Sequence, residues 1–223
     1  MEYFSLVETL RAMGEEDFAA FQARLIPIAR DRILGVRTPV LRALVKQYKG
    51  EWKTLLTFPD EYYEVTFIKL NACALLPYEE FSSVVKECVQ SVDNWAICDT
   101  FKARCIATHR EEFLPFIREF LGKGGFFARY ALVTLLSFYL EKEYLPEIFA
   151  ALAAADTRDY YVSMAAAWLT AEVLAKFFEE GKAFLEAGRL DEKTRDRAIR
   201  KARESYRVSA EKKEELLRLK KRE

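Results

Sequence analysis

The sequence predicts an all-α fold of the α-α superhelix class, a curved solenoid of HEAT-like repeats made of antiparallel helix pairs. Helix-breaking residues are scarce, with 8 glycines and 6 prolines among 223 residues, whereas strong helix formers are abundant. No alternating apolar and polar segment borders an Asn-Gly or Asp-Gly turn, so no β-hairpin is expected. Two helices with their turns take roughly 35–45 residues, the period of HEAT-type repeats. A helical bundle has the same local pattern and is the structural alternative.

The helices are expected to follow one another with short connections. Four aspartates stand where a carboxylate can cap the first amides of a helix, namely Asp60, Asp93, Asp156 and Asp191. No linker of biased composition interrupts the chain, so residues 1–223 are predicted to form a single domain. The predicted helices cover residues 2–13, 15–25, 38–48, 51–57, 60–76, 78–91, 93–109, 111–122, 125–141, 144–154, 158–180, 191–205 and 209–221.

Several classes of protein are not expected from this composition. No run of about 18 uncharged apolar residues is present, so no membrane span is predicted. The first residues, MEYFSLVETL, lack the basic segment of a signal peptide, and we expect a cytoplasmic protein. The cysteines (Cys73, Cys88, Cys98 and Cys105) form no CxxC pair, and His109 is the only histidine. We therefore expect buried cysteines and no metal site.

Charge is unevenly distributed along a chain whose net charge is zero. Residues 21–50 contain seven basic groups and one acidic group, and residues 191–223 contain thirteen basic and eight acidic groups. Such segregation can produce a basic surface on a neutral protein. It is equally consistent with solvated helix faces, so charge alone does not predict a nucleic-acid partner.

Two side chains in the segment DNWAICD form the first candidate site. Trp95 and Asp99 are four residues apart, so they share one face of the predicted helix, one turn from each other. An aspartate beside a tryptophan can lie in a partly dry site. Alternatively, Asp99 is a first-turn acid that the helix dipole favours.

Two further side chains stand out in strongly apolar helices. Arg129 is the only charged residue in FFARYALVTLLSFYL, residues 126–140, and it is either functional or a structurally paired arginine. Trp168 follows three alanines, where a tryptophan is usually part of the core. Trp95 and Arg129 are 34 residues apart, and Arg129 and Trp168 are 39 apart. Residues one repeat apart occupy equivalent places, so Trp95, Asp99, Arg129 and Trp168 are predicted to lie on the same concave side.

The sequence resembles the DNA alkylation repair proteins of the AlkD-like HEAT-repeat family. The resemblance runs over most of the chain, and its clearest segments are RILGVRTPVLRALVK, VDNWAICD, FFARYAL, YYVSMAAAWLTAEVLAK and the closing DRAIRKARESYRVSAEKKEELLRLKK. The combination of GVR-x-P-x-LR with a later W-x-x-x-D is fairly specific. One departure lies in FIKLNACALL, which lacks the arginine often found in the equivalent segment and has Lys69 as its single basic residue.

The resemblance implies a monofunctional glycosylase that releases N3- and N7-alkylated purines from double-stranded DNA. It implies a catalytic role for Asp99 and DNA-binding roles for Trp95, Arg129 and Trp168. No metal or organic cofactor and no membrane partner is implied, and we expect a monomer.

Two alternatives from other functional classes remain open. In the first, the chain binds damaged or branched DNA without catalysis. In the second, it is a HEAT-like scaffold for protein interactions, and its aromatic residues are core residues or contact a protein partner. Complete burial of Trp95 and Trp168 would favour the scaffold.

Overall fold

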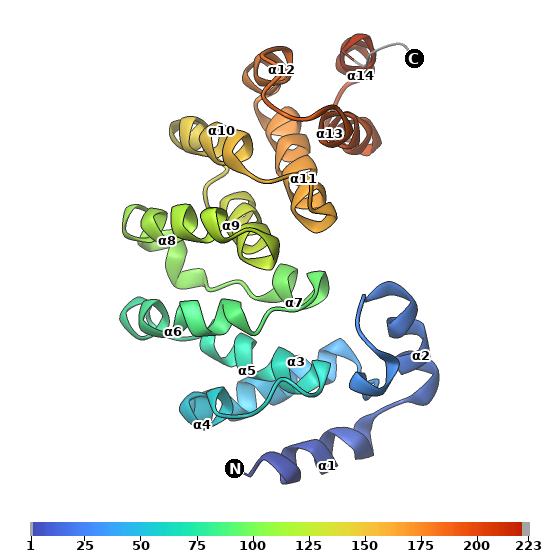
Figure 1. Cartoon of the computed structure of the whole chain (residues 1–223), viewed down its shortest axis with the longest axis vertical. Helices are drawn as coiled ribbons and strands as arrows, with labels where there is room; N and C mark the ends of the chain where they lie inside the picture. The colour runs from blue at the N-terminus through green and yellow to red at the C-terminus, as the bar shows by residue number, and fades with distance from the viewer. Residues whose placement is uncertain (1, 220–223) are drawn as a thin grey trace. The chain divides into compact units, whose positions relative to one another are not determined.

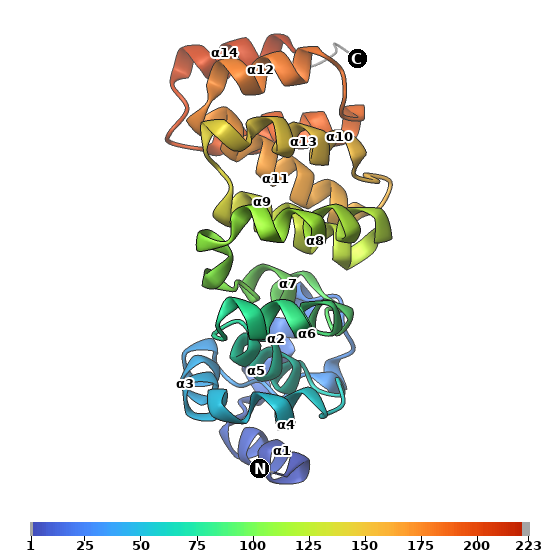
Figure 2. The same ribbon diagram turned by 90° about the vertical axis from the view of Figure 1, so that its left-hand side faces the viewer.

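The computed structural model describes residues 2–219, and within that range it contains helices and no β-strand. The chain divides into two compact units, Met1–His109 (unit 1) and Arg110–Glu223 (unit 2). Within each unit, the helices pack against one another in a layered arrangement (Figures 1 and 2). The predicted all-α, HEAT-like fold class is confirmed. The single domain over residues 1–223 remains a prediction.

Unit 1 is organised around one buried helix. Its helices are α1 (Tyr3–Met13), α2 (Glu16–Leu25), α3 (Thr38–Tyr48), α4 (Trp52–Leu56), α5 (Tyr63–Cys73), α6 (Tyr78–Gln90) and α7 (Trp95–Thr100). α5 contacts α1, α3, α4, α6 and α7. Ten of its eleven residues are buried, so nearly its whole circumference is covered by other parts of the unit. A helix of this kind is stable only when neighbours cover every face.

Glu64 anchors a connector, residues 26–37, to the centre of unit 1. The side chain is completely buried in α5. Its Oε1 accepts hydrogen bonds from the amides of Gly35 (2.8 Å) and Val36 (3.3 Å), and its Oε2 accepts one from Leu34 (3.0 Å). Burial raises the pKa of Glu64, and these amide bonds act in the opposite direction. The carboxylate satisfies three backbone donors that would otherwise be buried without partners.

Gly35 allows the connector to approach the start of α2 closely. Its φ is +83°, in the region that only glycine adopts without strain. A Cβ atom at this position would lie 2.3 Å from the carbonyl oxygen of Glu15 and 2.9 Å from the Cβ of Ala19. The glycine in the segment RILGVRTP is therefore required by both backbone conformation and packing.

Unit 2 contains a second sequence of packed helices. They are α8 (Arg110–Lys123), α9 (Gly125–Phe138), α10 (Leu145–Ala154), α11 (Tyr160–Lys176), α12 (Phe178–Glu186), α13 (Glu192–Glu204) and α14 (Ala210–Arg218). α9 packs against α8 and α11, and α11 packs against α12 and α13. Most residues of α9 and α11 are buried, as their apolar sequences predict.

Two predicted helices are interrupted. The helix predicted over 93–109 is the six-residue α7 followed by a 3-10 helix, Arg104–Thr108, because Phe101 leaves the helical region with ψ at 84°. The helix predicted over 158–180 ends at Lys176, where Phe177 has φ −132° and ψ 68°. α12 begins directly afterwards, and the sequence pattern had not separated it from α11.

Of the four predicted aspartate caps, only Asp191 is confirmed, since it accepts a hydrogen bond from the Thr194 amide at 3.1 Å. Asp60 lies before the turn that leads into α5, and Asp156 is paired with Arg158 at 2.6 Å. Asp93 is likewise not the cap of α7, as described below. In each of these three cases a nearby cation or another polar residue competes for the carboxylate.

The cysteines are buried as the sequence predicts, except that Cys105 is only half-buried. All four are free thiols. A hydrogen bond with Cys73 and burial together raise the pKa of Cys88, so its thiol stays protonated and poorly nucleophilic.

Candidate functional site

The start of α7 is capped by Asn94. The side-chain Oδ1 of Asn94 accepts a hydrogen bond from the Ile97 amide at 3.0 Å, and its Nδ2 donates to Oδ1 of Asp93 at 2.7 Å. Asn94 is 1% exposed. The prediction that Asp93 caps this helix was therefore wrong by one residue. Asn94 is the cap, and Asp93 holds the Asn94 side chain in place.

Trp95 is the first residue of α7 and is half-buried. Its indole Nε1 donates to the carbonyl oxygen of Leu25, the last residue of α2, at 3.1 Å. This contact joins residues 70 positions apart in the chain and sets the direction of the ring. A protein-interaction scaffold would be favoured by complete burial of Trp95, whereas this side chain is only half-buried.

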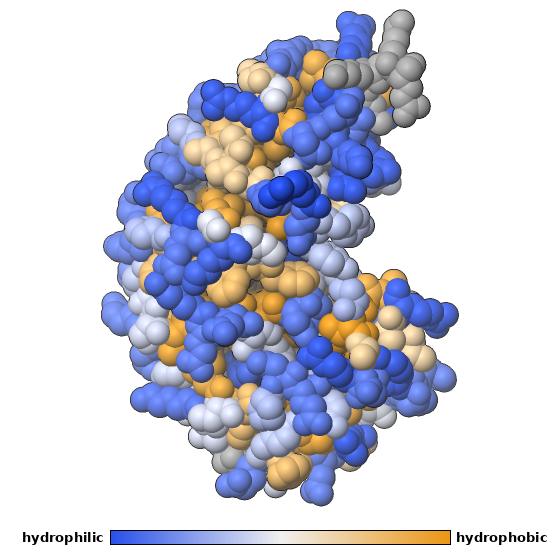
Figure 3. All heavy atoms as spheres, viewed as in Figure 1, coloured by the Kyte–Doolittle hydropathy of each residue, from blue (hydrophilic) through white to orange (hydrophobic). Residues whose placement is uncertain are grey.

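Asp99 is also half-buried and lies one turn after Trp95 on α7. Both residues belong to unit 1 and to a single short helix, so their spacing is local and rigid. Next to Trp95, α2 exposes apolar side chains, with Phe21 49% and Leu25 54% exposed. Hydrophobic side chains gather over α2 in the space-filling view (Figure 3).

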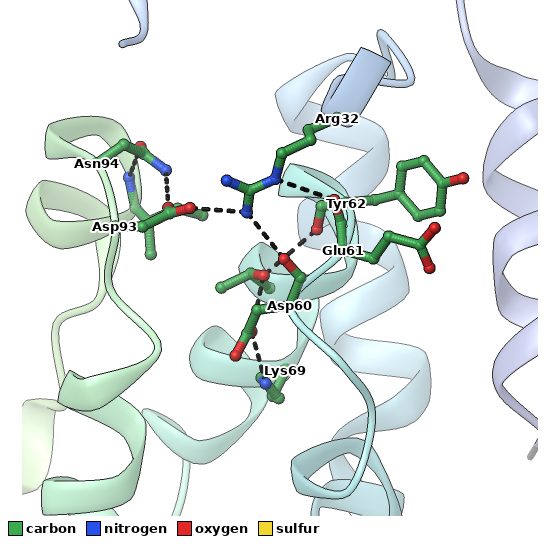
Figure 4. Close-up of polar contacts among 9 residues, drawn as sticks. Arg32, Asp60, Glu61, Tyr62, Lys69, Asp93 and Asn94 are labelled. Carbon is green, nitrogen blue, oxygen red and sulfur yellow. Dashed lines mark hydrogen bonds and ion pairs between the residues drawn. The ribbon is translucent and has the colours of Figure 1, made fainter. Parts of the chain in front are cut away.

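Arg32 connects the start of α7 to two other segments of unit 1 (Figure 4). Its Nη2 lies 2.7 Å from Oδ2 of Asp93 and donates to the carbonyl oxygen of Asp60 at 2.8 Å. Its Nε donates to the carbonyl oxygen of Glu61 at 3.2 Å. In the sequence, Arg32 is one of several basic residues in a basic segment. No neighbouring residue in the sequence indicates that Asp60, Glu61 and Asp93 are its partners.

Lys69, the one basic residue of FIKLNACALL, has a structural role. It is 2% exposed, and its Nζ lies 2.6 Å from Oδ1 of Asp60 and 3.1 Å from the carbonyl oxygen of Phe58. Oδ1 of Asp60 also accepts a hydrogen bond from Thr66 at 2.9 Å. A buried charge needs such partners, so Lys69 offers no accessible cation to a ligand.

Two basic side chains of α3 and a third on the residue directly after it are exposed at helical spacing. Arg42, Lys46 and Lys49 are all exposed, and positions four and three residues apart lie on one helix face. None of the three forms an ion pair within residues 2–219. They are called the α3 basic face below.

The other basic groups of residues 21–50 are largely neutralised by carboxylates. Arg30 pairs with Glu16 at 2.6 Å, and Arg37 pairs with Glu15 at 2.7 Å. Together with the pair between Arg32 and Asp93, these interactions leave the α3 basic face as the main concentration of positive charge in this segment.

Arg129 lies in α9 of unit 2 and is 6% exposed. Its Nη1 donates to the carbonyl oxygen of Tyr161, near the start of α11, at 2.8 Å. Part of this guanidinium therefore joins α9 to α11. The sequence left two interpretations of Arg129 open, a functional residue and a structurally paired arginine. The carbonyl oxygen of Tyr161 is a specific partner of the kind that the second interpretation requires.

Trp168 lies in the middle of α11 and is half-buried, whereas the preceding alanines, 165–167, are completely buried. The small alanines face the packed interior of unit 2, and the indole keeps part of its surface accessible. Trp168 is thus not a fully buried core residue.

A shallow pocket of about 410 Å³ lies in unit 2 and had no counterpart in the sequence predictions. It is lined by Thr157, Arg158, Tyr160, Asp191, Lys193 and Arg197. The guanidinium carbon of Arg197 lies 5.1 Å from the ring centroid of Tyr160, which is 55% exposed. An exposed ring beside cations is typical of surfaces that bind nucleic acid, although Asp191 reduces the net charge here.

Two features are absent from residues 2–219, the part of the chain that the structure describes: a cluster of side chains able to hold a metal ion and a helix able to span a membrane. In that part of the chain, no group of three or more His, Cys, Asp or Glu side chains is arranged to hold a metal ion. Among the same residues, no helix combines the length and apolar character needed to cross a lipid bilayer.

Comparison with known proteins adds one match. Residues 6–212 match the sequence model of the family described as DNA alkylation repair enzyme. The matched segment extends from α1 into α14, and it confirms the resemblance noted in the sequence. No curated protein matches the chain.

Proposed function

Because the chain belongs to the family of DNA alkylation repair enzymes, and thus has a role in the repair of alkylated DNA, we propose that it is a DNA glycosylase. In this proposal it hydrolyses the N-glycosidic bond of N3- or N7-alkylated purines in duplex DNA. The observation that carries the proposal is the pairing of Trp95 with Asp99 on α7. An aromatic ring and a carboxylate lie one turn apart there, both half-buried, on a helix whose start is fixed by a buried cap.

The proposed reaction suits a single carboxylate. A purine alkylated at N3 or N7 carries positive charge, so the bond from its nitrogen to C1′ breaks with the electron pair leaving on the base. The deoxyribose then becomes oxocarbenium-like, and a nearby fixed carboxylate stabilises that charge. Asp99 takes this role and orients a water molecule, whose oxygen bonds to C1′ as its proton is released. The products are the free alkylated base and an abasic site.

The remaining predicted site residues are assigned to DNA binding. Trp95 contacts the sugar of the damaged nucleotide through the exposed part of its ring, and Trp168 is assigned to DNA binding through the exposed part of its own ring. Arg129 contributes positive charge near the backbone, and the bond to Tyr161 holds its guanidinium in one orientation. The reaction uses no metal and no organic cofactor, and we propose that a monomer carries it out.

Release of free base from duplex DNA that contains N7-methylguanine or N3-methyladenine is the direct test. Wild type should release base, and Asp99→Asn should lower the single-turnover rate by about 10²–10³-fold, the usual cost of removing one electrostatic interaction from a transition state. The dissociation constant for DNA should change little, because the developing charge exists only in the transition state. Asp17→Asn is a matched control, since it removes an exposed carboxylate from α2 of the same unit.

The same measurements separate the alternatives. A protein that binds damaged DNA without catalysis would release no base and would bind equally well after Asp99→Asn. A protein-interaction scaffold would show no DNA binding even at low salt. Absence of base release from every cationic alkylpurine duplex would overturn the glycosylase proposal.

A further inference from the structure

We propose that Arg32 is a positioning residue for the site on α7 and that it acts through Asp93. The inference rests on the proposed glycosylase function, in which Trp95 and Asp99 must be held at a fixed place relative to the damaged nucleotide. Arg32 lies in the connector between α2 and α3, and it contacts neither Trp95 nor Asp99 by any hydrogen bond or ion pair that the structure records.

A continuous chain of polar contacts runs from Arg32 into the first turn of α7. The guanidinium of Arg32 holds Oδ2 of Asp93, and Oδ1 of Asp93 accepts from Nδ2 of Asn94. Oδ1 of Asn94 then accepts from the Ile97 amide. Because Asn94 is 1% exposed, its amide group has almost no contact with water that could replace these partners.

α7 is unusually sensitive to the geometry of its first turn. It contains six residues, fewer than two helical turns, so few internal hydrogen bonds stabilise it. Short helices depend on capping and tertiary contacts rather than on intrinsic propensity. A change in the side-chain orientation of Asn94 is therefore transmitted to Trp95 and Asp99.

The connector holds α7 at a second point. The Trp95 indole donates to the carbonyl oxygen of Leu25, which directly precedes the connector, while Arg32 lies within it. The connector is itself fixed to α5, because the buried Glu64 carboxylate accepts hydrogen bonds from three of its amides. The two contacts are thus anchored to the same rigid segment.

The partners of Arg32 distinguish this role from phosphate binding. Two of its nitrogens are engaged with two backbone carbonyl oxygens and one carboxylate, and about a third of its side chain is exposed. Its charge is thus balanced within unit 1, unlike the charges of the α3 basic face. Loss of Arg32 should therefore impair catalysis more than DNA affinity.

The test compares Arg32→Gln with Arg37→Gln. Arg37 lies in the same connector and is also paired with one carboxylate, but its partner is Glu15, the residue directly before α2. The single-turnover rate of base release from an N7-methylguanine duplex should fall about 10-fold in Arg32→Gln, since displacement of a catalytic group by about 1 Å can cost up to 10²-fold. The dissociation constant for the same duplex should stay within about threefold of wild type, as expected for a charge already paired.

A second readout does not require activity. Exchange of the Ile97 amide hydrogen, measured by NMR, should accelerate at least about 10-fold in Arg32→Gln, because exchange reports local opening. Arg37→Gln should leave both the rate and the exchange within about twofold of wild type. In Arg32→Gln with Asp93→Asn, the second substitution should add less than about twofold to the loss, because both residues act in one chain.

Three outcomes would overturn the positioning role. One is weaker DNA binding in Arg32→Gln with an unchanged single-turnover rate, which would make Arg32 a phosphate-binding residue. Another is unchanged exchange of the Ile97 amide, and the third is an equal loss of activity in Arg37→Gln. If the wild type releases no base, the proposed glycosylase function fails, whereas the exchange measurement still tests the link from Arg32 to α7.

Discussion

Substitution of Gly35 by alanine should destabilise the protein by about 1–5 kcal/mol, and the figure follows from two separate features of the site. With φ at +83°, an alanine incurs a backbone cost of roughly 1–2 kcal/mol. Its Cβ would also lie 2.3 Å from the Glu15 carbonyl oxygen, and forcing a methyl group into a packed site typically costs about 1–3 kcal/mol. Loss of unfolded-state entropy offsets about 0.4–1 kcal/mol of the total.

Three other glycines separate these two contributions. Gly14 would place a Cβ 2.2 Å from the Leu34 carbonyl oxygen without a positive φ, so its alanine variant reports the clash. Gly188 has a φ of +66° and open space around it, so its variant reports the backbone cost. Gly50 has neither feature, and its variant should be as stable as wild type or more stable by about 0.5 kcal/mol.

Urea denaturation followed by far-ultraviolet circular dichroism measures the series. Gly35→Ala should have the lowest midpoint, Gly14→Ala and Gly188→Ala should lie between it and wild type, and Gly50→Ala should match or exceed wild type. A Gly35→Ala protein as stable as Gly188→Ala would show that the connector yields to the added methyl group. The reasoning about close approach to α2 would then be refuted.

Two further predictions concern DNA binding and pH. Replacing Arg42, Lys46 and Lys49 of the α3 basic face with glutamine should lower the slope of log affinity against log salt by about 0.9 for each phosphate that these side chains neutralise in the wild type; an unchanged slope would place this face away from DNA. Burial is the main cause that raises the pKa of Tyr63 to about 12 from its ordinary value of 10.0. Between those pH values the folded protein holds more protons than the unfolded chain, so stability should fall as pH rises, by at most about 2–3 kcal/mol. Tyr63→Phe should lose less stability than wild type over the same range in urea titrations, and an equal loss would contradict the assignment.

The extent of sequence-based prediction is clearest at α7. The four-residue spacing of Trp95 and Asp99 was sufficient to place both residues one turn apart on a helix. The end of that helix was predicted wrongly, because Phe101 leaves the helical conformation without a glycine or proline nearby. The capping residue was also misplaced, since Asp93 and Asn94 have similar capping propensities and only a distant arginine decides between them.

Buried charges illustrate the same limit. Glu64 and Lys69 occur in α5 among apolar residues, and sequence position alone does not reveal whether such groups are functional or structural. Glu64 binds amides 28–30 residues earlier in the chain, and Lys69 binds the turn before its own helix. Nothing in the sequence pattern specifies that the connector turns its amides toward α5.

The helical class, most helix positions, the family resemblance and the sharing of one helix by Trp95 and Asp99 were all predictable from the amino-acid sequence. The resemblance rests on specific motifs, whereas the three helical features depend on periodicity and capping within a few residues, which operate before the chain is compact. The contacts that hold α7, through Arg32 and Leu25, and the bond from Arg129 to the backbone of Tyr161 are visible only in the folded chain. The contact between Trp95 and Leu25 joins residues 70 positions apart, and the contact between Arg129 and Tyr161 joins residues 32 positions apart. At such separations, side-chain packing rather than local preference selects the partner.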